Sequence, residues 1–251
     1  MDINLIVLCL GLFLISILYS SVGHGGASGY LAILSLSTFA SMESSWLKQH
    51  VWCLNLVVAA IAFYHYYKAG FYVKKFTIPF ILGSVPFAII GGALKINGDV
   101  YDYLLSITLI WAAYRLYQTK EIIEKGKVVN LSLKTTLPIG GSIGFLSGVI
   151  GVGGGIFLSP ILLLKKWADP KSVATTSALF IWVNSAAGLF GAGLSKQLEI
   201  DLNILLPFIV SVIIGGYIGS KFGSNTNQSK IKSILIIVLI IAALKRILEF
   251  I

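Results

Sequence analysis

Two glycine clusters are the part of this sequence whose residue types and spacing point to binding chemistry. The first occupies residues 23–26 (Gly-His-Gly-Gly) and the second residues 151–155 (Gly-Val-Gly-Gly-Gly), and an apolar segment follows each of them. Glycines that lead into a helix let successive backbone N–H groups converge on one point, where the helix dipole adds positive potential. Each cluster therefore predicts a half-helix, beginning near Ala27 or Gly155, whose N-terminus favours an anion. Close helix packing is the alternative use of such glycines in a membrane.

A few polar side chains accompany the glycines. Asn55 and Asn184 lie in the middle of apolar segments, where an amide can donate to an anion or form an interhelical hydrogen bond. His24 lies inside the first cluster, where an imidazole can donate to a substrate, carry a coupled proton or merely stabilise the break. Hydroxyl side chains flank the clusters and can add donors or cap helices: Ser20, Ser21, Ser28, Ser147, Ser159, Thr176 and Ser177.

The elements that must position these residues are strongly apolar. The chain has 251 residues, 57% of them hydrophobic and 12% charged, with a mean hydropathy of +0.90. A soluble domain usually carries about a quarter charged residues, and a helix of about 20 apolar residues crosses the hydrocarbon core of a bilayer. We therefore predict an all-α polytopic membrane protein embedded in a lipid bilayer. The first apolar run lacks a basic flank and a cleavage site, so we expect it to be a membrane helix rather than a signal peptide.

Ten apolar segments are expected. They cover residues 3–22, 27–39, 47–67, 76–94, 101–117, 135–150, 155–164, 173–194, 202–222 and 231–248. The second and seventh are too short to span a bilayer, and each follows a glycine cluster. Each half of the chain thus opens with a glycine-broken or re-entrant helix pair, a pattern that marks the binding site in transporters.

The two halves form an internal repeat. Adding 128 to residue 23 gives Gly151, and adding 129 to residue 55 gives Asn184. The repeated unit has about five segments, and an odd number makes the second half enter the membrane from the opposite face, so we predict two inverted repeats. We place the first repeat at residues 1–118, a polar linker at 119–134 and the second repeat at 135–251.

The basic residues predict an orientation. If the short segments cross the membrane or form half of a re-entrant hairpin, 14 of the 19 Lys and Arg residues fall on the side of the linker. The positive-inside rule makes that side cytoplasmic, with both termini outside the plasma (inner) membrane. Lys48 falls on the other side, and we interpret it as a lysine whose ammonium snorkels to the interface. We infer no nucleic-acid partner from the net charge of +9.

Acidic residues and reactive groups exclude several function classes. All ten carboxylates fall in loops or at segment ends, so we expect no buried carboxylate to hold a cation or relay protons. No nucleophile with a base, and no metal-ligand cluster, stands out. We therefore expect no enzyme: no catalytic residue, no metal and no cofactor. Anion transport is the remaining interpretation.

Residues 148–162 (GVIGVGGGIFLSPIL) resemble the glycine-rich signature of the TauE/SafE sulfite exporter family, and residues 174–178 (ATTSA) resemble its small Thr-Ser segment. The first half departs from the signature, because Ala27 and Ala32 stand where the second half has Gly155 and Pro160. The resemblance implies transport of small sulfur-containing anions such as sulfite, thiosulfate or organosulfonates. The residues expected to bind substrate are Gly23, His24, Gly25, Gly26, Asn55, Gly151, Gly153, Gly154, Gly155, Thr176, Ser177 and Asn184.

The expected mechanism is secondary transport by alternating access, with the two halves rocking around an anion at the glycine breaks. An anion channel, or a permease for another small organic anion, is the alternative. The sequence leaves the coupling ion, the direction of transport and the oligomeric state open, a homodimer included.

Overall fold

The computed structural model describes residues 3–118 and 128–225. In these residues the chain consists of helices joined by loops and contains no strand, as predicted. The helices are α1 (Ile3–Ser20), α2 (Ala27–Ser35), α3 (Ser44–Lys68), α4 (Lys74–Ala93), α5 (Gly98–Gln118), α6 (Leu133–Ile150), α7 (Gly155–Leu164), α8 (Pro170–Leu194) and α9 (Leu202–Asn225). The tenth predicted segment, residues 231–248, lies outside the described residues.

The helices differ in whether they are long enough to cross a membrane. Five of them, α3, α4, α6, α8 and α9, are long and apolar enough to span a bilayer. Helices α2 and α7 have only 9 and 10 residues. At a rise of 1.5 Å per residue, each covers roughly half of the hydrocarbon thickness. The prediction of two short helices after the glycine clusters is therefore confirmed.

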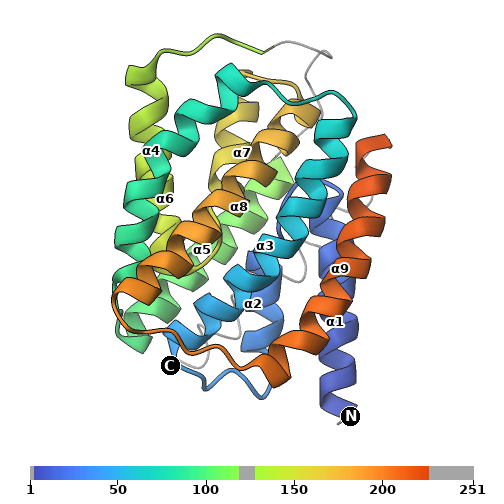
Figure 1. Ribbon diagram of the computed structural model, residues 1–251, viewed down its shortest axis with the longest axis vertical. Coiled ribbons are helices and arrows are strands. Elements are labelled where there is room, and N and C mark those ends of the chain that lie inside the picture. The colour runs from blue at the N-terminus through green and yellow to red at the C-terminus, as the bar shows by residue number, and fades with distance from the viewer. Residues whose placement is uncertain (1–2, 119–127, 226–251) are drawn as a thin grey trace.

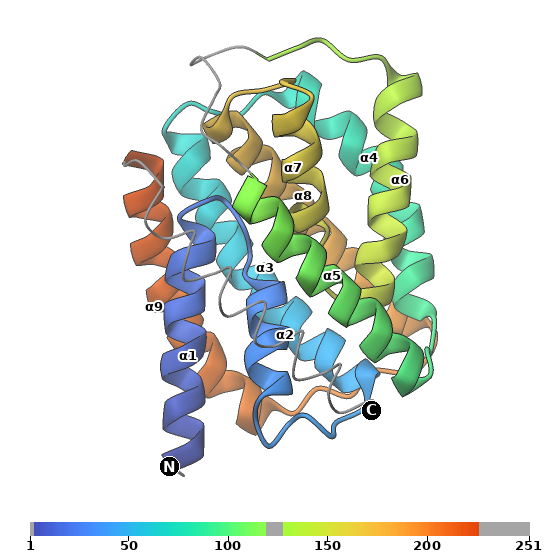
Figure 2. The same cartoon turned by 180° about the vertical axis from the view of Figure 1, so that it is seen from behind.

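Corresponding helices of the two halves run in opposite directions. Helix α1 begins at one end of the molecule, whereas α6 begins at the other end (Figures 1 and 2). Helices α2 and α7 both begin in the interior and run toward opposite ends. The predicted inverted repeat requires these directions.

The basic loops also separate by end. The loops after α3 and α7 and the C-terminal end of α9 lie at one end of the molecule, and the loops after α2, α4 and α8 lie at the other (Figure 1). The first end carries most of the lysines of these connections, which is the grouping that the positive-inside count uses. Which end is cytoplasmic stays a prediction.

Helix packing does not follow the boundary between the sequence halves. Helix α4 of the first half packs against α6 and α8, and α9 of the second half packs against α1 and α3. Glycines allow this close approach, because a Cβ atom on Gly83 or Gly144 would collide with the backbone of the facing helix, as would one on Gly219. The first two lie between α4 and α6 and the third between α1 and α9. Each half therefore contributes its fourth helix to the packing of the other half.

The outward faces of the helices are apolar. Leu10, Leu82, Phe190 and Leu206 are all more than half exposed, together with many other large apolar side chains. Exposed apolar surface on this scale marks contact with a partner or a membrane. Such faces fit a chain whose spanning helices contact lipid.

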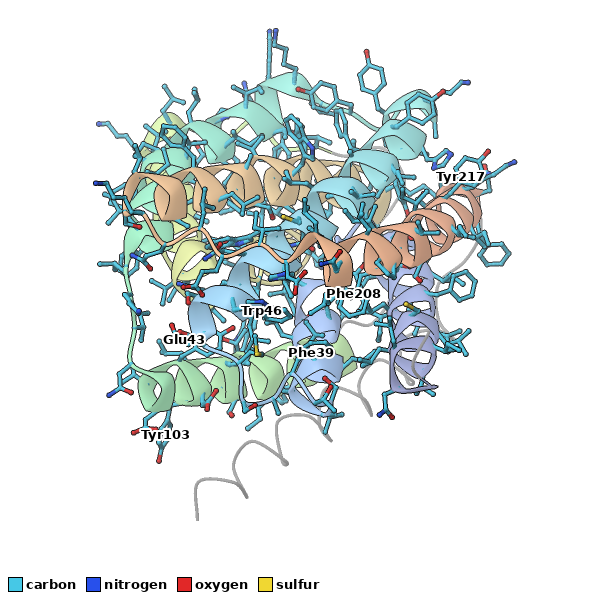
Figure 3. All side chains as sticks on the ribbon, turned by 60° about the horizontal axis from the view of Figure 1, so that its bottom comes forward. Phe39, Glu43, Trp46, Tyr103, Phe208 and Tyr217 are labelled. Atoms are coloured by element: carbon cyan, nitrogen blue, oxygen red, sulfur yellow. The ribbon has the colours of Figure 1, made fainter. Side chains whose placement is uncertain are left out.

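An aromatic cluster lies at the end of the molecule at which α3 begins. Phe39 in the loop after α2 stacks on Trp46 of α3, with ring centroids 5.2 Å apart, and meets Phe208 of α9 edge-on (Figure 3). His50 stacks on the other side of this cluster, 3.7 Å from the Trp46 ring. The start of α3 is thereby fixed against α9.

Gln49 and His50 fix the loop between α8 and α9 at the same end. The Gln49 side chain donates to the Gln197 carbonyl at 2.5 Å and accepts from the Glu199 N–H at 2.7 Å. His50 Nε2 accepts from the Asp201 N–H at 3.0 Å, and its Nδ1 donates to the Trp46 carbonyl at 2.8 Å. These partners require a neutral imidazole with its proton on Nδ1.

Two predictions about charged residues are wrong. Asp169 lies at the start of α8, as expected, but it is buried, because its carboxylate caps the helix by accepting from the N–H groups of Lys171 and Ser172. Lys48 does not reach the interface, since only 2% of its surface is exposed. Its stem packs on Gly151 and its ammonium reaches the Leu94 carbonyl, so Lys48 lies inside the protein.

Candidate functional site

The two glycine breaks have left-handed backbone that interrupts the chain between α1 and α2 and between α6 and α7. Gly26 and Gly154 are the residues before α2 and α7, with φ angles of +103° and +83°. A side chain would be strained at either position, and glycine offers no side-chain acceptor to the first N–H groups of the helix. Both short helices thus begin without a side-chain cap on their first N–H groups.

Asn55 lies where the two breaks meet. A Cβ atom placed on Gly25 would be 2.9 Å from Asn55 Cγ, and one placed on Gly153 would be 2.8 Å from Asn55 Nδ2. The Asn55 side chain is fully buried and donates to the Ser185 hydroxyl at 3.3 Å, while its Oδ1 has no hydrogen-bond partner among the described residues. One amide from α3 therefore touches both breaks, and its Nδ2 group has a second proton that can donate to a ligand.

Ile181 of α8 forms the apolar wall of the same junction. Its Cγ2 atom would lie 2.9 Å from a Cβ on Gly25 and 2.8 Å from one on Gly153, and its side chain also packs on Gly155. Sequence reasoning missed Ile181, because an isoleucine in an apolar helix carries no signal of its own.

A chain of hydrogen bonds connects the first break to the second half. His24 Nε2 lies 3.0 Å from the Ser159 hydroxyl of α7, which lies 2.6 Å from the Ser177 hydroxyl of α8. Nε2 is also 3.3 Å from the Gly155 carbonyl, and Nδ1 is 3.1 Å from the Val22 carbonyl. The structure therefore brings together His24, Ser159 and Ser177 from three separate segments.

Two predicted residues have their contacts elsewhere. The Thr176 hydroxyl pairs with Thr77 of α4 at 2.8 Å. The Asn184 amide donates to the Phe180 carbonyl of its own helix at 2.8 Å, and its Oδ1 has no hydrogen-bond partner among the described residues. Both side chains are buried, but neither has a hydrogen bond to a glycine break.

The first glycines of the two breaks pack against helices. A Cβ atom on Gly23 would be 2.5 Å from the Cα of Ala174 in α8, and one on Gly151 would be 2.9 Å from Cγ of Lys48 in α3. Close packing, which was the alternative interpretation of the glycines, thus applies at these two positions. The same contact places a buried lysine against the second break.

The whole arrangement consists of two helix N-termini, one amide shared by both breaks and a small cluster of hydroxyl and imidazole groups. Most of these groups can donate hydrogen bonds, and no carboxylate among the described residues hydrogen-bonds to them. Such a site suits a small anion with several acceptor oxygens.

Comparison with known proteins identifies the family. The family model for the sulfite exporter TauE/SafE matches residues 8–246, which is nearly the whole chain. The chain belongs to the TauE/SafE sulfite exporter family. A TauE/SafE relative of this chain, the probable membrane transporter protein y4hK of Sinorhizobium fredii (strain NBRC 101917 / NGR234), is 33% identical over 198 residues, which cover 76% of this chain and 78% of that protein.

The TauE/SafE match confirms the resemblance seen in the sequence, and it makes this chain a multi-pass protein of a membrane transporter family. The five spanning helices and the exposed apolar faces described above agree with this class. No solved structure matches the chain.

Proposed function

We propose that this protein is a secondary transporter of small sulfur-containing oxyanions, such as sulfite, thiosulfate or short organosulfonates. The substrate binds where the two glycine breaks meet, near the middle of the membrane. Its oxygens accept hydrogen bonds from the first N–H groups of α2 and α7 and from the Asn55 amide.

This proposal rests on one observation, which is that both glycine breaks contact the Asn55 side chain. Two helix N-termini that begin in the interior and run to opposite ends direct positive potential to the same region. An anion bound there satisfies N–H groups that the protein itself leaves open. The sulfur chemistry of the substrate comes from the family alone.

The way the helices are grouped supports alternating access as the mechanism. Helices α1, α3 and α9 pack together, and so do α4, α6 and α8, with α3 and α8 in contact between the two groups. We propose that these two groups, rather than the two sequence halves, rock against each other around the bound anion. Each group then contributes one of the two half-helices, α2 or α7.

An anion channel is the second candidate, because the same donors could line a pore. Purified protein in liposomes distinguishes the two. Uptake of radiolabelled thiosulfate and sulfite should be competed by unlabelled sulfur oxyanions but not by chloride or a carboxylate. A transporter should also exchange, so that unlabelled anion inside the liposomes accelerates uptake of labelled anion.

Uptake without acceleration by internal anion, growing linearly with the gradient, would support the channel. No uptake of any sulfur anion, from protein that is folded by circular dichroism and monodisperse by gel filtration, would exclude the proposed substrate class.

A further inference from the structure

Lys48 is a buried cation with no ionic partner in the part of the chain that the structure describes. Its side chain is 2% exposed, and its Nζ donates to the Leu94 carbonyl at 3.3 Å. The described residues contain one ion pair, between the exposed side chains of Lys95 and Glu43, so no described carboxylate lies within ion-pair distance of Lys48. A buried charge is costly unless an opposite charge or several hydrogen bonds compensate it. The Leu94 carbonyl uses one of the three ammonium protons.

Trp52 lies one turn further along α3 and carries a second open donor. The Trp52 side chain is fully buried, and its indole Nε1 has no hydrogen-bond partner among the described residues. The Lys48 ammonium lies 5.8 Å from the centre of the Trp52 ring. An indole N–H and an ammonium can only donate, so the group that would satisfy both must be an acceptor.

Both donors lie beside the same short stretch of α4. The ring carbon of Trp52 that is bonded to Nε1 would be 2.7 Å from a Cβ atom on Gly188, and Gly188 packs on Gly92 of α4. Lys48 reaches the carbonyl of Leu94, two residues beyond Gly92. The indole ring and the ammonium therefore both lie near the C-terminal end of α4.

The two donors are aligned with the proposed binding site at the breaks. Lys48, Trp52 and Asn55 are spaced i, i+4 and i+7, so they share one face of α3. The stem of Lys48 packs on Gly151 of the second break. This face of α3 thus carries donors from the covered end of the helix to the amide that touches both breaks.

The other half carries no cation at the equivalent place. Adding 129 to residues 48 and 52 gives Ser177 and Ile181 of α8. Helices α3 and α8 run in opposite directions (Figure 1), and Lys48 and Ser177 each lie in the N-terminal part of their helix. The first half therefore has a buried lysine at a position where the second half has a serine.

We propose that the Lys48 ammonium and the Trp52 indole N–H form a second anion-binding site, between Asn55 and the end of the molecule at which α3 begins. This Lys48–Trp52 site takes the same small sulfur oxyanion as it passes to or from the glycine breaks, so the inference rests on the proposed function. An oxyanion compensates the lysine charge and accepts from both donors at once.

The test compares two variants, each with a matched control, in detergent-purified protein. Lys48→Met removes the charge and keeps the length of the side chain, and Trp52→Phe removes the N–H and keeps an aromatic ring. Lys95→Met removes an equal charge from the surface, and Trp182→Phe removes an indole from a side chain that is 42% exposed. Isothermal titration measures the affinity for sulfite, thiosulfate and methanesulfonate.

For the anion that the wild-type protein binds best, Lys48→Met should weaken binding about 10- to 100-fold, as expected for a hydrogen bond to a charged group. Trp52→Phe should weaken it about 2- to 10-fold, as expected for a neutral one. Both surface controls should bind as the wild type does. Without anion, Lys48→Met should unfold at the same or a higher temperature than the wild type, because it removes an uncompensated buried charge.

Wild-type affinity in both Lys48→Met and Trp52→Phe would overturn the Lys48–Trp52 site and leave the proposed function standing. A lower unfolding temperature of Lys48→Met, combined with unchanged affinity in Trp52→Phe, would also overturn the Lys48–Trp52 site. Lys48 would then serve to stabilise the packing of α3 against the end of α4, and not to bind an anion. A wild-type protein that binds none of the three anions would overturn the proposed function, and this site with it.

Discussion

The imidazole Nε2 of His24 lies 3.0 Å from the hydroxyl oxygen of Ser159, so the first glycine break is bonded directly to the short helix of the other half. The Val22 carbonyl can only accept, which places a proton on Nδ1. In the neutral ring, Nε2 accepts from Ser159. In the protonated ring, Nε2 can instead donate to the Gly155 carbonyl at 3.3 Å. Both protonation states of His24 thus have partners in the same geometry.

His24 is accordingly the residue that we expect to couple anion movement to protons. The groups that face the ring are two backbone carbonyls, the Ser159 hydroxyl and the edge of the Tyr19 ring, none of them charged at neutral pH. Protonation would add a positive charge beside the breaks, so anion uptake should rise as the pH falls from about 8 to about 5. His24→Gln keeps hydrogen-bonding groups but cannot take up the proton. Uptake by this variant should be independent of pH while anion binding persists, as measured in liposomes across that range. If uptake by His24→Gln depended on pH as wild-type uptake does, His24 would not be the residue that couples uptake to protons.

Gly25→Ala should disable the site by displacing Asn55. The added Cβ would lie 2.9 Å from both Asn55 Cγ and Ile181 Cγ2, so the amide must move. We expect overpacking to destabilise the protein by about 1–3 kcal/mol and uptake to fall at least tenfold. Gly98→Ala is the matched control, since a Cβ there meets nothing within 4 Å. Thermal unfolding and liposome uptake measure both effects, and normal uptake by Gly25→Ala would argue that Asn55 is not a ligand.

Asn184→Leu separates a binding amide from a structural one. Asn184 donates to its own helix and has an open Oδ1 among the described residues, so an apolar side chain of similar size should leave stability nearly unchanged. If the amide serves the substrate in another state of the transport cycle, uptake should be abolished. The readouts are uptake and thermal unfolding, and Asn203→Leu on the exposed start of α9 provides the control. Retained uptake would remove Asn184 from the proposed site.

Gln49→Leu should loosen the end of the molecule at which α3 begins. The substitution removes two hydrogen bonds to the loop between α8 and α9 and leaves the Glu199 N–H without its acceptor. We expect a loss of about 1–3 kcal/mol in the free energy of unfolding, measured by thermal or denaturant unfolding in detergent. Affinity for the anion should change little, because Gln49 contacts the loop and not the breaks. An unchanged unfolding temperature would mean that the loop does not depend on this side chain.

The starts of the short helices could be predicted from the sequence because glycine clusters determine them locally. Ala27 and Gly155 begin α2 and α7 where the clusters end, and no tertiary information was needed. The burial of Lys48 and Asp169 could not be predicted, because it depends on which distant segment covers each of them. The hydrogen bonds that join His24 to Ser159 and Ser159 to Ser177 could not be predicted for the same reason, because these residues lie in segments that are far apart in the chain.

The exchange of the fourth helices makes the two halves of the chain depend on each other. Helix α4 finds its packing partners, α6 and α8, in the second half, and α9 finds α1 and α3 in the first. Neither half can therefore be detached from the chain without stripping the other half's fourth helix of its packing partners.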